Sequence, residues 1–343
     1  MIAAHYKPGH GVSVVEAEAV PPGPGHVQIA VAYNGICGTD LHIAHGAMDE
    51  RVGEGSVIGH EMSGRVVAGG EGTEEWPPGT PVTVMPLLWC GKCPTCLAGN
   101  RHICDTLTFV GIDSPGALQQ LWTVPQEILI ELPHSLSLRA AALVEPVAVA
   151  HHDVVRGRVQ AGEHVVVVGG GPVGVLIAIV ATYRGAHVTV VEVDAFRRGV
   201  IDKLGLTSID PIAQDVVAVV EASTGGAGAD VSFEVSGSQP GLTTSLAVLR
   251  PRGRLVAVGI HPQPREMDLK RVFWRELEIL GARVYERSDY DGAIDLIATE
   301  VIPVDALISE VVPLTEAPAA FEALARGGSV MKVLVDCGQE EAS

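Results

Sequence analysis

Hydrophobic and polar positions alternate in the first part of the chain, which is the pattern of half-buried β-strands. Residues 27–32 show this alternation, and a turn rich in proline and glycine precedes them at residues 21–25. Residues 62–67 and 81–85 are further short apolar runs, separated by turns of glycine and proline. The first part of the chain is therefore predicted to be rich in β-structure.

The pattern then changes, and apolar strands alternate with helix-like segments. In chain order these segments are 164–168, 173–183, 187–191, 197–204, 231–235 and 254–259. Such alternation indicates a parallel sheet with crossover helices. The pieces after about residue 285 cannot form a core of their own, and residues 330–335 are expected to rejoin the first domain as a closing strand. We expect one domain from residues 1–149 and 286–343, and a second from residues 150–285.

One stretch resembles a membrane span, because residues 165–183 carry no charge. Three glycines and a proline stand together inside it, at residues 169–172. A spanning helix would not place them there, whereas a nucleotide-binding turn needs them. The N-terminal residues show no apolar run behind a basic start, so no signal peptide is predicted. We therefore expect a soluble, cytoplasmic protein.

Charge and glycine content narrow the class of protein. The formal net charge is −18, and a surface this acidic repels phosphate backbones and anionic lipids. Neither nucleic acid nor membrane is an expected partner. The 40 glycines among 343 residues point to many tight turns and to close approaches of backbone to ligand. The chain is also long enough for two domains of ordinary size.

Four of the six cysteines are close together in the sequence: Cys90, Cys93, Cys96 and Cys104. In a chain without a secretion signal, such clustering favours a metal over disulfides. Four thiolates can surround one zinc ion tetrahedrally, and a closed shell of this kind makes a structural site. An iron–sulfur cluster and a set of free thiols are the alternatives. Cys337 has no assigned role and is expected to be inert.

A second group of metal-ligand residues is spread along the first domain. Cys37, His60 and either Glu61 or Glu145 would supply one thiolate, one imidazole and one carboxylate. Three such ligands leave zinc an open position for a substrate oxygen, as a catalytic site requires. Each residue alone is weak evidence for a metal site, because a lone cysteine usually packs as a small hydrophobe and a lone histidine is usually structural.

A glycine-rich turn follows the apolar run 164–168 and opens an apolar helix. Its residues are Gly169, Gly171, Pro172, Val173 and Gly174. In this context the glycines allow a pyrophosphate close to backbone amides at a helix N-terminus, so a dinucleotide site is predicted. The alternative is a tight turn without a ligand.

The residues after the next strand bear on the choice of coenzyme. Glu192 ends that strand, and a carboxylate there binds the adenosine ribose hydroxyls and repels a 2′-phosphate, which favours NAD over NADP. Asp194 is a second candidate for this role. Arg197 and Arg198 complicate the assignment, because arginines here can accept a 2′-phosphate. Otherwise they stack on adenine or begin a solvated helix.

The order of these elements resembles the zinc-dependent medium-chain alcohol dehydrogenase family across nearly the whole chain. The matching pieces are residues 37–42, residues 59–64, the four-cysteine lobe and the glycine turn. The resemblance implies an α/β protein with two domains. One is a GroES-like, β-rich catalytic domain, and the other is a Rossmann coenzyme domain with a doubly wound parallel sheet.

The resemblance also implies a ligand set. Cys37 and His60 should bind a catalytic zinc, and Glu61 or Glu145, or both in turn, should complete it. Glu145 stands where alcohol dehydrogenases with two cysteine ligands have the second one. That replacement is similar to the polyol, butanediol and threonine dehydrogenase branch. Asp40 would accept a hydrogen bond from the other nitrogen of His60. Two zinc ions per chain are expected, one catalytic and one structural.

The implied activity is hydride transfer from a secondary alcohol to NAD. Zinc would lower the pKa of the substrate hydroxyl. Thr39 would contact that oxygen, and His42 would relay its proton outward. Vicinal diols or polyols are the leading substrates, followed by L-threonine and simple alcohols. Arg283 and Tyr285 lie in a stretch similar to butanediol dehydrogenases and are candidates for the substrate cleft. A homodimer or homotetramer is expected from the family.

Two other classes of protein remain as alternatives. A non-enzymatic, zinc-stabilised NAD-binding regulator would keep the cysteine lobe and the glycine turn, but it would not need Cys37, Thr39 and His60 together. A zinc-free quinone reductase of the same superfamily would lack both cysteine sites. The joint presence of these residues counts against both alternatives.

Overall fold

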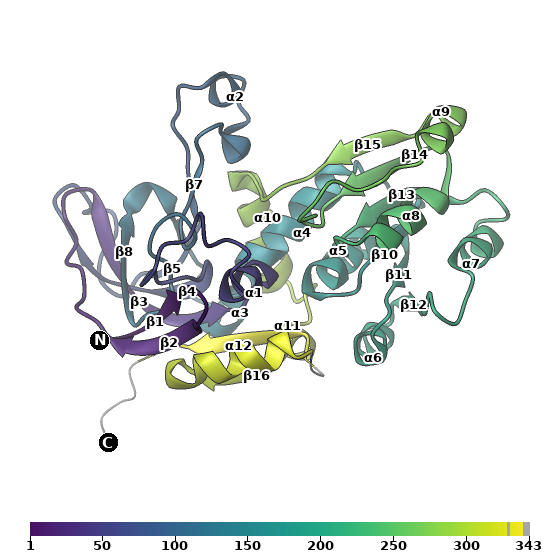
Figure 1. Cartoon of the computed structure of the whole chain (residues 1–343). Coiled ribbons are helices and arrows are strands. Elements are labelled where there is room, and N and C mark those ends of the chain that lie inside the picture. Colours follow the sequence, from purple (N-terminus) through teal and green to yellow (C-terminus); the bar gives the residue numbers. More distant parts are fainter. Residues whose placement is uncertain (328–329, 339–343) are drawn as a thin grey trace. The chain divides into compact units, whose positions relative to one another are not determined.

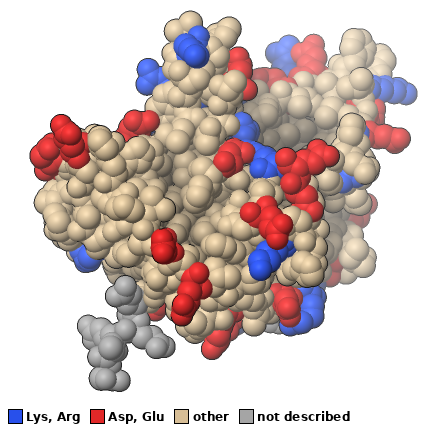
Figure 2. Space-filling view, turned by 60° about the vertical axis from the view of Figure 1, so that its left-hand side comes forward, with Lys and Arg blue, Asp and Glu red and all other residues tan. Residues whose placement is uncertain are grey.

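The computed structural model describes residues 1–327 and 330–338, and the chain divides into two compact units. The first unit comprises Met1–Glu145 together with Ala293–Ser343, and the second comprises Pro146–Gly292. Figure 1 traces the elements of both units in chain order. Acidic side chains are spread over the face drawn in Figure 2, in keeping with the net charge of −18.

The first unit is built mainly on β-strands. Its largest sheet has the order β16-β17-β3-β4-β5-β9, and β8 also pairs with β3. These strands are β3 (His26–Gly35), β4 (Glu61–Gly69), β5 (Pro81–Val84), β8 (Leu121–Pro125), β9 (Leu129–Glu131), β16 (Ile308–Pro313) and β17 (Lys332–Asp336). Buried and half-buried positions alternate along β3, as the hydrophobic pattern predicts.

Smaller elements complete the first unit. Two more strand pairs are β1 (Ile2–Lys7) with β2 (Gly11–Glu16), and β6 (Leu87–Leu88) with β7 (Thr108–Phe109). The helices within this unit are α1 (Gly38–Ala44), α2 (Pro94–Leu97), α3 (Leu138–Ala141), α11 (Val304–Leu307) and α12 (Ala317–Ala325). Single 3₁₀ turns lie at Arg101–Ile103, Gln126–Ile128 and Leu314–Glu316.

The closing strand predicted at residues 330–335 is β17, and it begins two residues later than expected. It runs antiparallel to β3, with Leu334 opposite Gly35 and Val335 opposite Asn34. The last part of the chain therefore belongs to the same sheet as β3 and β4. Its buried side chains Val333, Leu334 and Val335 add to the core of the first unit.

The second unit carries a parallel sheet of six strands in the order β12-β11-β10-β13-β14-β15. The strands are β10 (His164–Val168), β11 (His187–Val191), β12 (Thr207–Ile209), β13 (Ala229–Glu234), β14 (Leu249–Ala257) and β15 (Glu278–Gly281). The helices between them are α5 (Pro172–Tyr183), α6 (Ala195–Lys203), α7 (Val216–Ser223), α8 (Gln239–Ala247) and α9 (Leu269–Arg275). Two further helices, α4 (Val144–Arg156) and α10 (Arg287–Ala298), span the boundaries between the units.

The strand order reverses between β10 and β13, and ligands of doubly wound sheets bind outside the carboxyl ends of the strands at such a point. The uncharged stretch 165–183 consists of β10, a glycine turn and α5, as the glycines predict. Within residues 1–327 and 330–338, no helix is long and apolar enough to cross a membrane.

One buried acid of the second unit lacks a hydrogen-bond partner among the described residues. Asp153 on α4 is fully buried, and neither of its carboxylate oxygens is hydrogen-bonded there. Burial, and then the nearby charge of Asp289, raise the pKa of Asp153 well above its usual value. Burial also acts to raise the pKa of Asp289. Hydrogen bonds from His151 and His152, at 2.8 and 2.9 Å, outweigh it and hold that pKa below its usual value.

We expect Asp153→Asn to stabilise the protein more at pH 8 than at pH 5. The folded chain holds the Asp153 proton at pH values where the unfolded chain, with a pKa of about 4, has released it. Stability is therefore lost as pH rises from about 4 through the folded pKa. The amide removes this loss and should raise stability by about 1–2 kcal/mol at pH 8.

Scanning calorimetry at both pH values measures the effect as a change in Tm. Asp295→Asn, on the exposed face of α10, is the matched control and should leave Tm unchanged. A Tm below that of the wild type at pH 8 for Asp153→Asn would mean that the carboxylate stabilises the fold.

Candidate zinc and coenzyme sites

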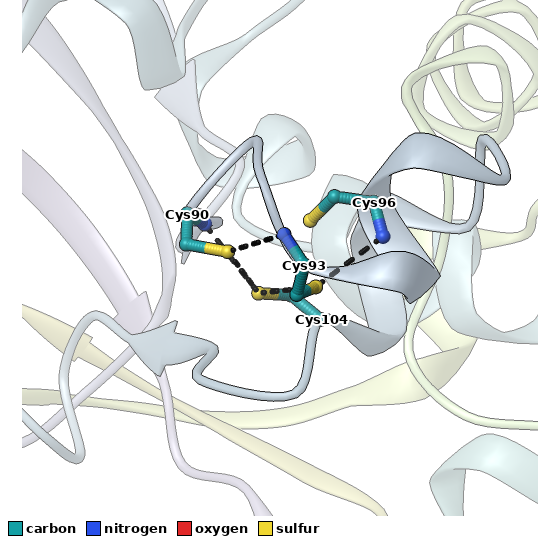
Figure 3. A group of neighbouring side chains, drawn as sticks. All are labelled: Cys90, Cys93, Cys96 and Cys104. Carbon is teal, nitrogen blue, oxygen red and sulfur yellow. Dashed lines mark hydrogen bonds between the residues drawn. The ribbon is translucent and has the colours of Figure 1, made fainter.

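The four clustered cysteines lie around one point of the first unit. Their sulfur atoms all lie within 4.8 Å of one another, and Figure 3 shows the sulfurs turned toward a common centre. Cys93 is the N-cap of α2, where Pro94 occupies the first helical position and fixes the start of the turn. The sulfur of Cys104 lies 3.6 Å from that of Cys90 and 3.8 Å from that of Cys93.

These distances fit a single zinc ion. With Zn–S bonds of about 2.3 Å, a tetrahedral site places its sulfurs roughly 3.8 Å apart. Backbone N–H groups donate to three of the sulfurs: that of Cys93 to Cys90 at 3.3 Å, that of Cys96 to Cys93 at 3.3 Å, and those of Cys90 and Thr106 to Cys104 at 3.4 Å. Such bonds favour thiolate over thiol.

The pKa values of these thiols agree with a metal site. The backbone N–H groups of Lys92 and Cys93 lower the pKa of Cys90 to about 6. Burial, and then the neighbouring cysteines, raise the pKa of Cys96 to about 12. The neighbouring sulfurs share the Cys96 proton through hydrogen bonds, and a cation that displaced this proton would be bound by all four sulfurs, so the donor set suits a structural zinc.

Cys37, His60 and Glu61 form a second group whose ligand atoms lie within 4.8 Å of one another. Cys37 precedes α1, His60 directly precedes β4, and Glu61 is the first residue of β4. The antiparallel pairing of β3 with β4 sets Gly35 opposite Glu61. A Cβ atom at Gly35 would lie 2.2 Å from Oε2 of Glu61, so only glycine leaves room for that carboxylate.

Asp40 contacts two of these candidate ligands, Cys37 and His60. Its Oδ2 accepts a hydrogen bond from the backbone N–H of Cys37 at 2.9 Å. Its Oδ1 lies 3.6 Å from Nδ1 of His60, so the hydrogen bond expected between them is replaced by a longer electrostatic contact. Burial lowers the pKa of His60, but the charges of Asp40 and Cys37 outweigh burial and raise it well above its usual value. The Phe109 ring packs edge-on against the imidazole at 5.2 Å.

Lys332 is a site residue that the sequence interpretation missed. Its amine is buried and donates to both oxygens of Glu61, at 2.6 and 2.8 Å, and to the carbonyl of Ile36 at 3.2 Å. Burial lowers the pKa of Lys332, but the charge of Glu61 outweighs burial and raises it. The sequence contained one sign of this role: Lys332 lies inside the apolar strand β17, and a buried charge there needs a partner.

Glu145 lies in the first turn of α4 and is 4% exposed. Its charge is the smallest of the named causes that raise the pKa values of His60 and Lys332, and its carboxylate is not among the ligand atoms of Cys37, His60 and Glu61 that lie within 4.8 Å of one another. Thr39 is half-buried and His42 is exposed, and both lie on α1. Since they are three residues apart, they share one face of the helix.

The glycine turn stands at the carboxyl end of β10. Gly169 has a φ of +107°, and a Cβ there would lie 2.9 Å from the backbone nitrogen of Ser236. A Cβ at Gly174 would lie 1.9 Å from the carbonyl oxygen of Gly169, so the third glycine is required for close packing of helix on strand. Gly171 is the N-cap of α5, and Pro172 and Val173 are its first residues.

Glu192 is fixed beside this turn. It is 5% exposed, and its carboxylate accepts backbone N–H bonds from Gly170 at 2.7 Å and Asp194 at 2.8 Å. Asp194 instead caps α6 by accepting from the N–H of Arg197, so the structure gives it a different role. Arg198 donates to the carbonyls of Glu192 and Val193 and pairs with Asp210 at 2.8 Å.

Arg197 differs from Arg198 because it stays accessible. Its guanidinium is 40% exposed and lies 3.9 Å from Oε2 of Glu192. A Cβ at Gly171 would lie 3.6 Å from the same guanidinium. Arg197 is therefore the arginine placed beside the glycine turn, whereas Arg198 is used within the fold.

Two further residues of the second unit correct or extend the sequence interpretation. Tyr285 is fully buried, with its ring edge-on to Tyr290 at 4.9 Å, so it cannot present its side chain to a substrate as expected. Arg283 is exposed. Glu234 was not predicted as a site residue; it is fully buried at the end of β13 and pairs with Nε2 of His261 at 2.9 Å.

Together, a zinc-ligand set in a β-rich unit and a glycine turn in a doubly wound sheet define a zinc- and dinucleotide-dependent enzyme. Comparison with known proteins agrees. Residues 23–134 match the alcohol dehydrogenase GroES-like domain, and residues 172–299 match the zinc-binding dehydrogenase family. The chain therefore belongs to the zinc-dependent medium-chain alcohol dehydrogenases.

Three relatives place the chain more closely. It is 48% identical to 2-dehydro-3-deoxy-L-galactonate 5-dehydrogenase of Pseudoalteromonas atlantica, over 99% of this chain and 100% of that protein. It is 30% identical to sorbitol dehydrogenase of Halalkalibacterium halodurans, over 98% of each chain. A zinc-binding dehydrogenase from Sinorhizobium meliloti, solved with bound NADP, is 31% identical with a TM-score of 0.92 and 98% of each chain covered.

These findings confirm the predicted fold, a GroES-like domain with a Rossmann domain, and the predicted class of enzyme. The chain is a zinc-dependent oxidoreductase that acts on secondary alcohols and uses a nicotinamide coenzyme. Sugar- and polyol-type alcohols fit the relatives as substrates.

We expect Cys93→Ser to lose one of two zinc ions and to lower Tm by several degrees, because a structural zinc contributes directly to folding free energy. Elemental analysis and calorimetry measure the two effects. Cys337→Ala is the matched control: Cys337 is buried, burial raises its thiol pKa, and it lies outside both cysteine groups. Equal zinc content in Cys93→Ser and the wild type would contradict the four-cysteine site.

Proposed function

We propose that the chain oxidises a secondary hydroxyl of a polyhydroxylated sugar acid with NAD, in the manner of 2-dehydro-3-deoxy-L-galactonate 5-dehydrogenase. The supporting observation is 48% identity to that enzyme with both chains covered almost entirely. A sugar acid of this kind carries neighbouring hydroxyls, so it falls within the diol and polyol class that the sequence favours. The proposal adds a carboxylate to that class.

We propose that the first unit holds the catalytic zinc through Cys37, His60 and Glu145. Cys37 and His60 lie together with Glu61, but both oxygens of Glu61 accept from Lys332. Glu145 is buried nearby and supplies the remaining carboxylate. When bound, zinc supplies a Lewis acid that makes the substrate hydroxyl easier to deprotonate. If Glu61 and Glu145 took turns as the zinc ligand, Lys332 would have to release Glu61.

The proposed reaction removes a hydride from the carbinol carbon and a proton from the hydroxyl, and the oxidised nicotinamide takes the hydride. Thr39 accepts the hydroxyl proton through its own oxygen, and His42 receives it further along the same face of α1. The exposure of His42 gives the proton an outlet to water. Asp40 positions Cys37 through the backbone of that residue and faces His60.

We propose that the second unit binds NAD at Gly169, Gly171, Pro172, Val173 and Gly174. Glu192 supports NAD over NADP, because its buried carboxylate is aimed by the N–H groups of Gly170 and Asp194. Arg197 beside it is accessible, and we assign it to the adenosine or the pyrophosphate. The Sinorhizobium meliloti relative was solved with NADP, so the two coenzymes are compared directly in the test of Glu192.

We propose self-association into a dimer or tetramer through the second unit. Its strand β15 is a sheet edge, and the neighbouring helix α9 exposes 73% of Phe273 and 71% of Trp274. Open edges and adjacent exposed aromatic rings favour association between chains. The cytoplasmic location stays a prediction, supported by cysteine sulfurs arranged for a metal.

The substrate proposal predicts the highest kcat/KM for 2-dehydro-3-deoxy-L-galactonate within a panel that also contains sorbitol, xylitol, 2,3-butanediol and L-threonine. NADH formation by the zinc-loaded enzyme measures each rate. We expect the sugar acid to exceed the next substrate by at least about tenfold, the effect of one well-placed polar contact. A higher value for a polyol or for L-threonine would replace the substrate and leave the reaction class in place.

The catalytic site is tested on the best substrate with Cys37→Ala. Loss of a Lewis acid worth several kcal/mol should lower kcat by roughly a thousandfold. NADH binding, followed by its fluorescence, should change little because the glycine turn belongs to the other unit. Cys337→Ala serves again as the matched cysteine control. Full activity of Cys37→Ala would overturn the proposed ligand set.

Coenzyme choice is tested with Glu192→Ser. Removing a carboxylate that repels a 2′-phosphate, while keeping Arg197, should raise the NADP-to-NAD ratio of kcat/KM by roughly a hundredfold. Glu221→Gln, an exposed acid on α7, should leave the ratio unchanged. Equal losses with both coenzymes would mean that Glu192 only supports the turn.

A further inference from the structure

Two histidines stand side by side at the amino ends of neighbouring strands in the second unit. His164 is the first residue of β10, and His187 is the first residue of β11. The two strands are parallel, and the two residues are register partners, so both side chains leave the same face of the sheet. Their ring centroids are 5.1 Å apart, with 33° between the planes.

Both rings border a surface hollow of about 340 Å³. Hydroxyl groups from Thr182, Thr189, Thr207 and Ser223 also line it, and no lysine, arginine, aspartate or glutamate does. Within the described part of the chain, neither imidazole ring makes a hydrogen bond, so the ring nitrogens are available to a ligand from solvent. The hollow is therefore polar, open and uncharged.

Three helices of the second unit end at this hollow. Thr182 lies in the last turn of α5, Ser223 is the last residue of α7, and Gly205 follows the end of α6. The carbonyl groups at a helix C-terminus carry a partial negative charge. Three such ends beside two imidazoles favour a cation and disfavour a phosphate or carboxylate.

The spacing of the two rings suits joint coordination of one ion. Zinc–nitrogen bonds are about 2.0–2.1 Å, so two imidazoles on one tetrahedral zinc have centroids roughly 5 Å apart. The observed separation is 5.1 Å. Water molecules can fill the remaining positions.

We propose that His164 and His187 form a binding site for a divalent transition metal ion of the class that prefers imidazole, such as Zn²⁺. This site is separate from the coenzyme site, because the glycine turn follows the carboxyl end of β10, five residues or roughly 16 Å along the strand. It uses none of the cysteine, histidine or glutamate ligands of the first unit. The ion links β10 to β11 and binds only the folded chain, so it stabilises the fold.

The site is tested with Zn²⁺ alone, added to protein that has first been loaded with zinc and freed of excess metal. Equilibrium dialysis with elemental analysis counts the additional zinc, and calorimetry follows Tm. The wild type should take up one more zinc per chain than His164→Gln or His187→Gln. Each substitution should weaken this uptake at least about tenfold, since each removes one of two imidazole ligands. His134→Gln, at an exposed position of the first unit, should behave as the wild type.

The double variant His164→Gln/His187→Gln separates a shared ion from two independent ones. If both rings hold one ion, the double variant loses no more zinc than either single variant. Additive losses, or equal zinc uptake by the wild type and both single variants, would overturn the proposal and leave the rings as a stacked pair. A rise in Tm with added Zn²⁺ that persists in the double variant would contradict stabilisation through this site. These comparisons are made between variants, so they do not depend on which substrate or coenzyme the enzyme uses.

Discussion

The buried ion pair between Glu61 and Lys332 is the contact on which the arrangement of the first unit depends. It joins β4 to β17 across 271 positions of sequence, and the same amine binds the carbonyl of Ile36 next to Cys37. A buried pair of this kind adds little net stability, because both charges lose their hydration. Breaking it is costly, since one charge would remain alone in the core. The pair therefore fixes one position of the closing strand relative to the segments that carry Cys37 and His60.

This constraint also bears on the charge of the proposed zinc site. Lys332 neutralises Glu61, so Cys37 as thiolate and Glu145 as carboxylate carry two negative charges against the two positive charges of zinc. With Glu61 as the third ligand, a buried lysine would lose its partner beside a cation, which is unfavourable in a low dielectric. The electrostatics of the group thus support the proposal that Glu145 is the ligand in the resting enzyme. In that proposal Glu61 serves chiefly to hold Lys332.

The features that the sequence predicted well are local ones. Cys90, Cys93 and Cys96 are spaced by a short turn, and Gly169 follows a strand and opens a helix, so neighbouring residues alone define both motifs. The strands and helices around these motifs also have a regular hydrophobic period that can be read directly from the sequence. Lys332 and its contact with Glu61 were not predicted, because that contact depends on where the last strand enters the sheet. Tyr285 was misplaced for the same reason: its burial against Tyr290 comes from packing, which sequence similarity to a substrate-binding stretch does not reveal.

The parallel sheet of the second unit has two edges, and these differ because helices begin at one and end at the other. In a parallel sheet with crossover helices, every helix begins at the carboxyl edge of the strands and ends at the amino edge. The beginning of α5 therefore offers N–H groups beside Gly169, Gly171 and Gly174, which suits the pyrophosphate of a dinucleotide. The ends of α5, α6 and α7 offer carbonyls beside His164 and His187, which suits a cation. The anion site is familiar in such folds because a glycine turn marks it. The cation site needs ligands as well as potential, and here two register partners on adjacent strands supply them.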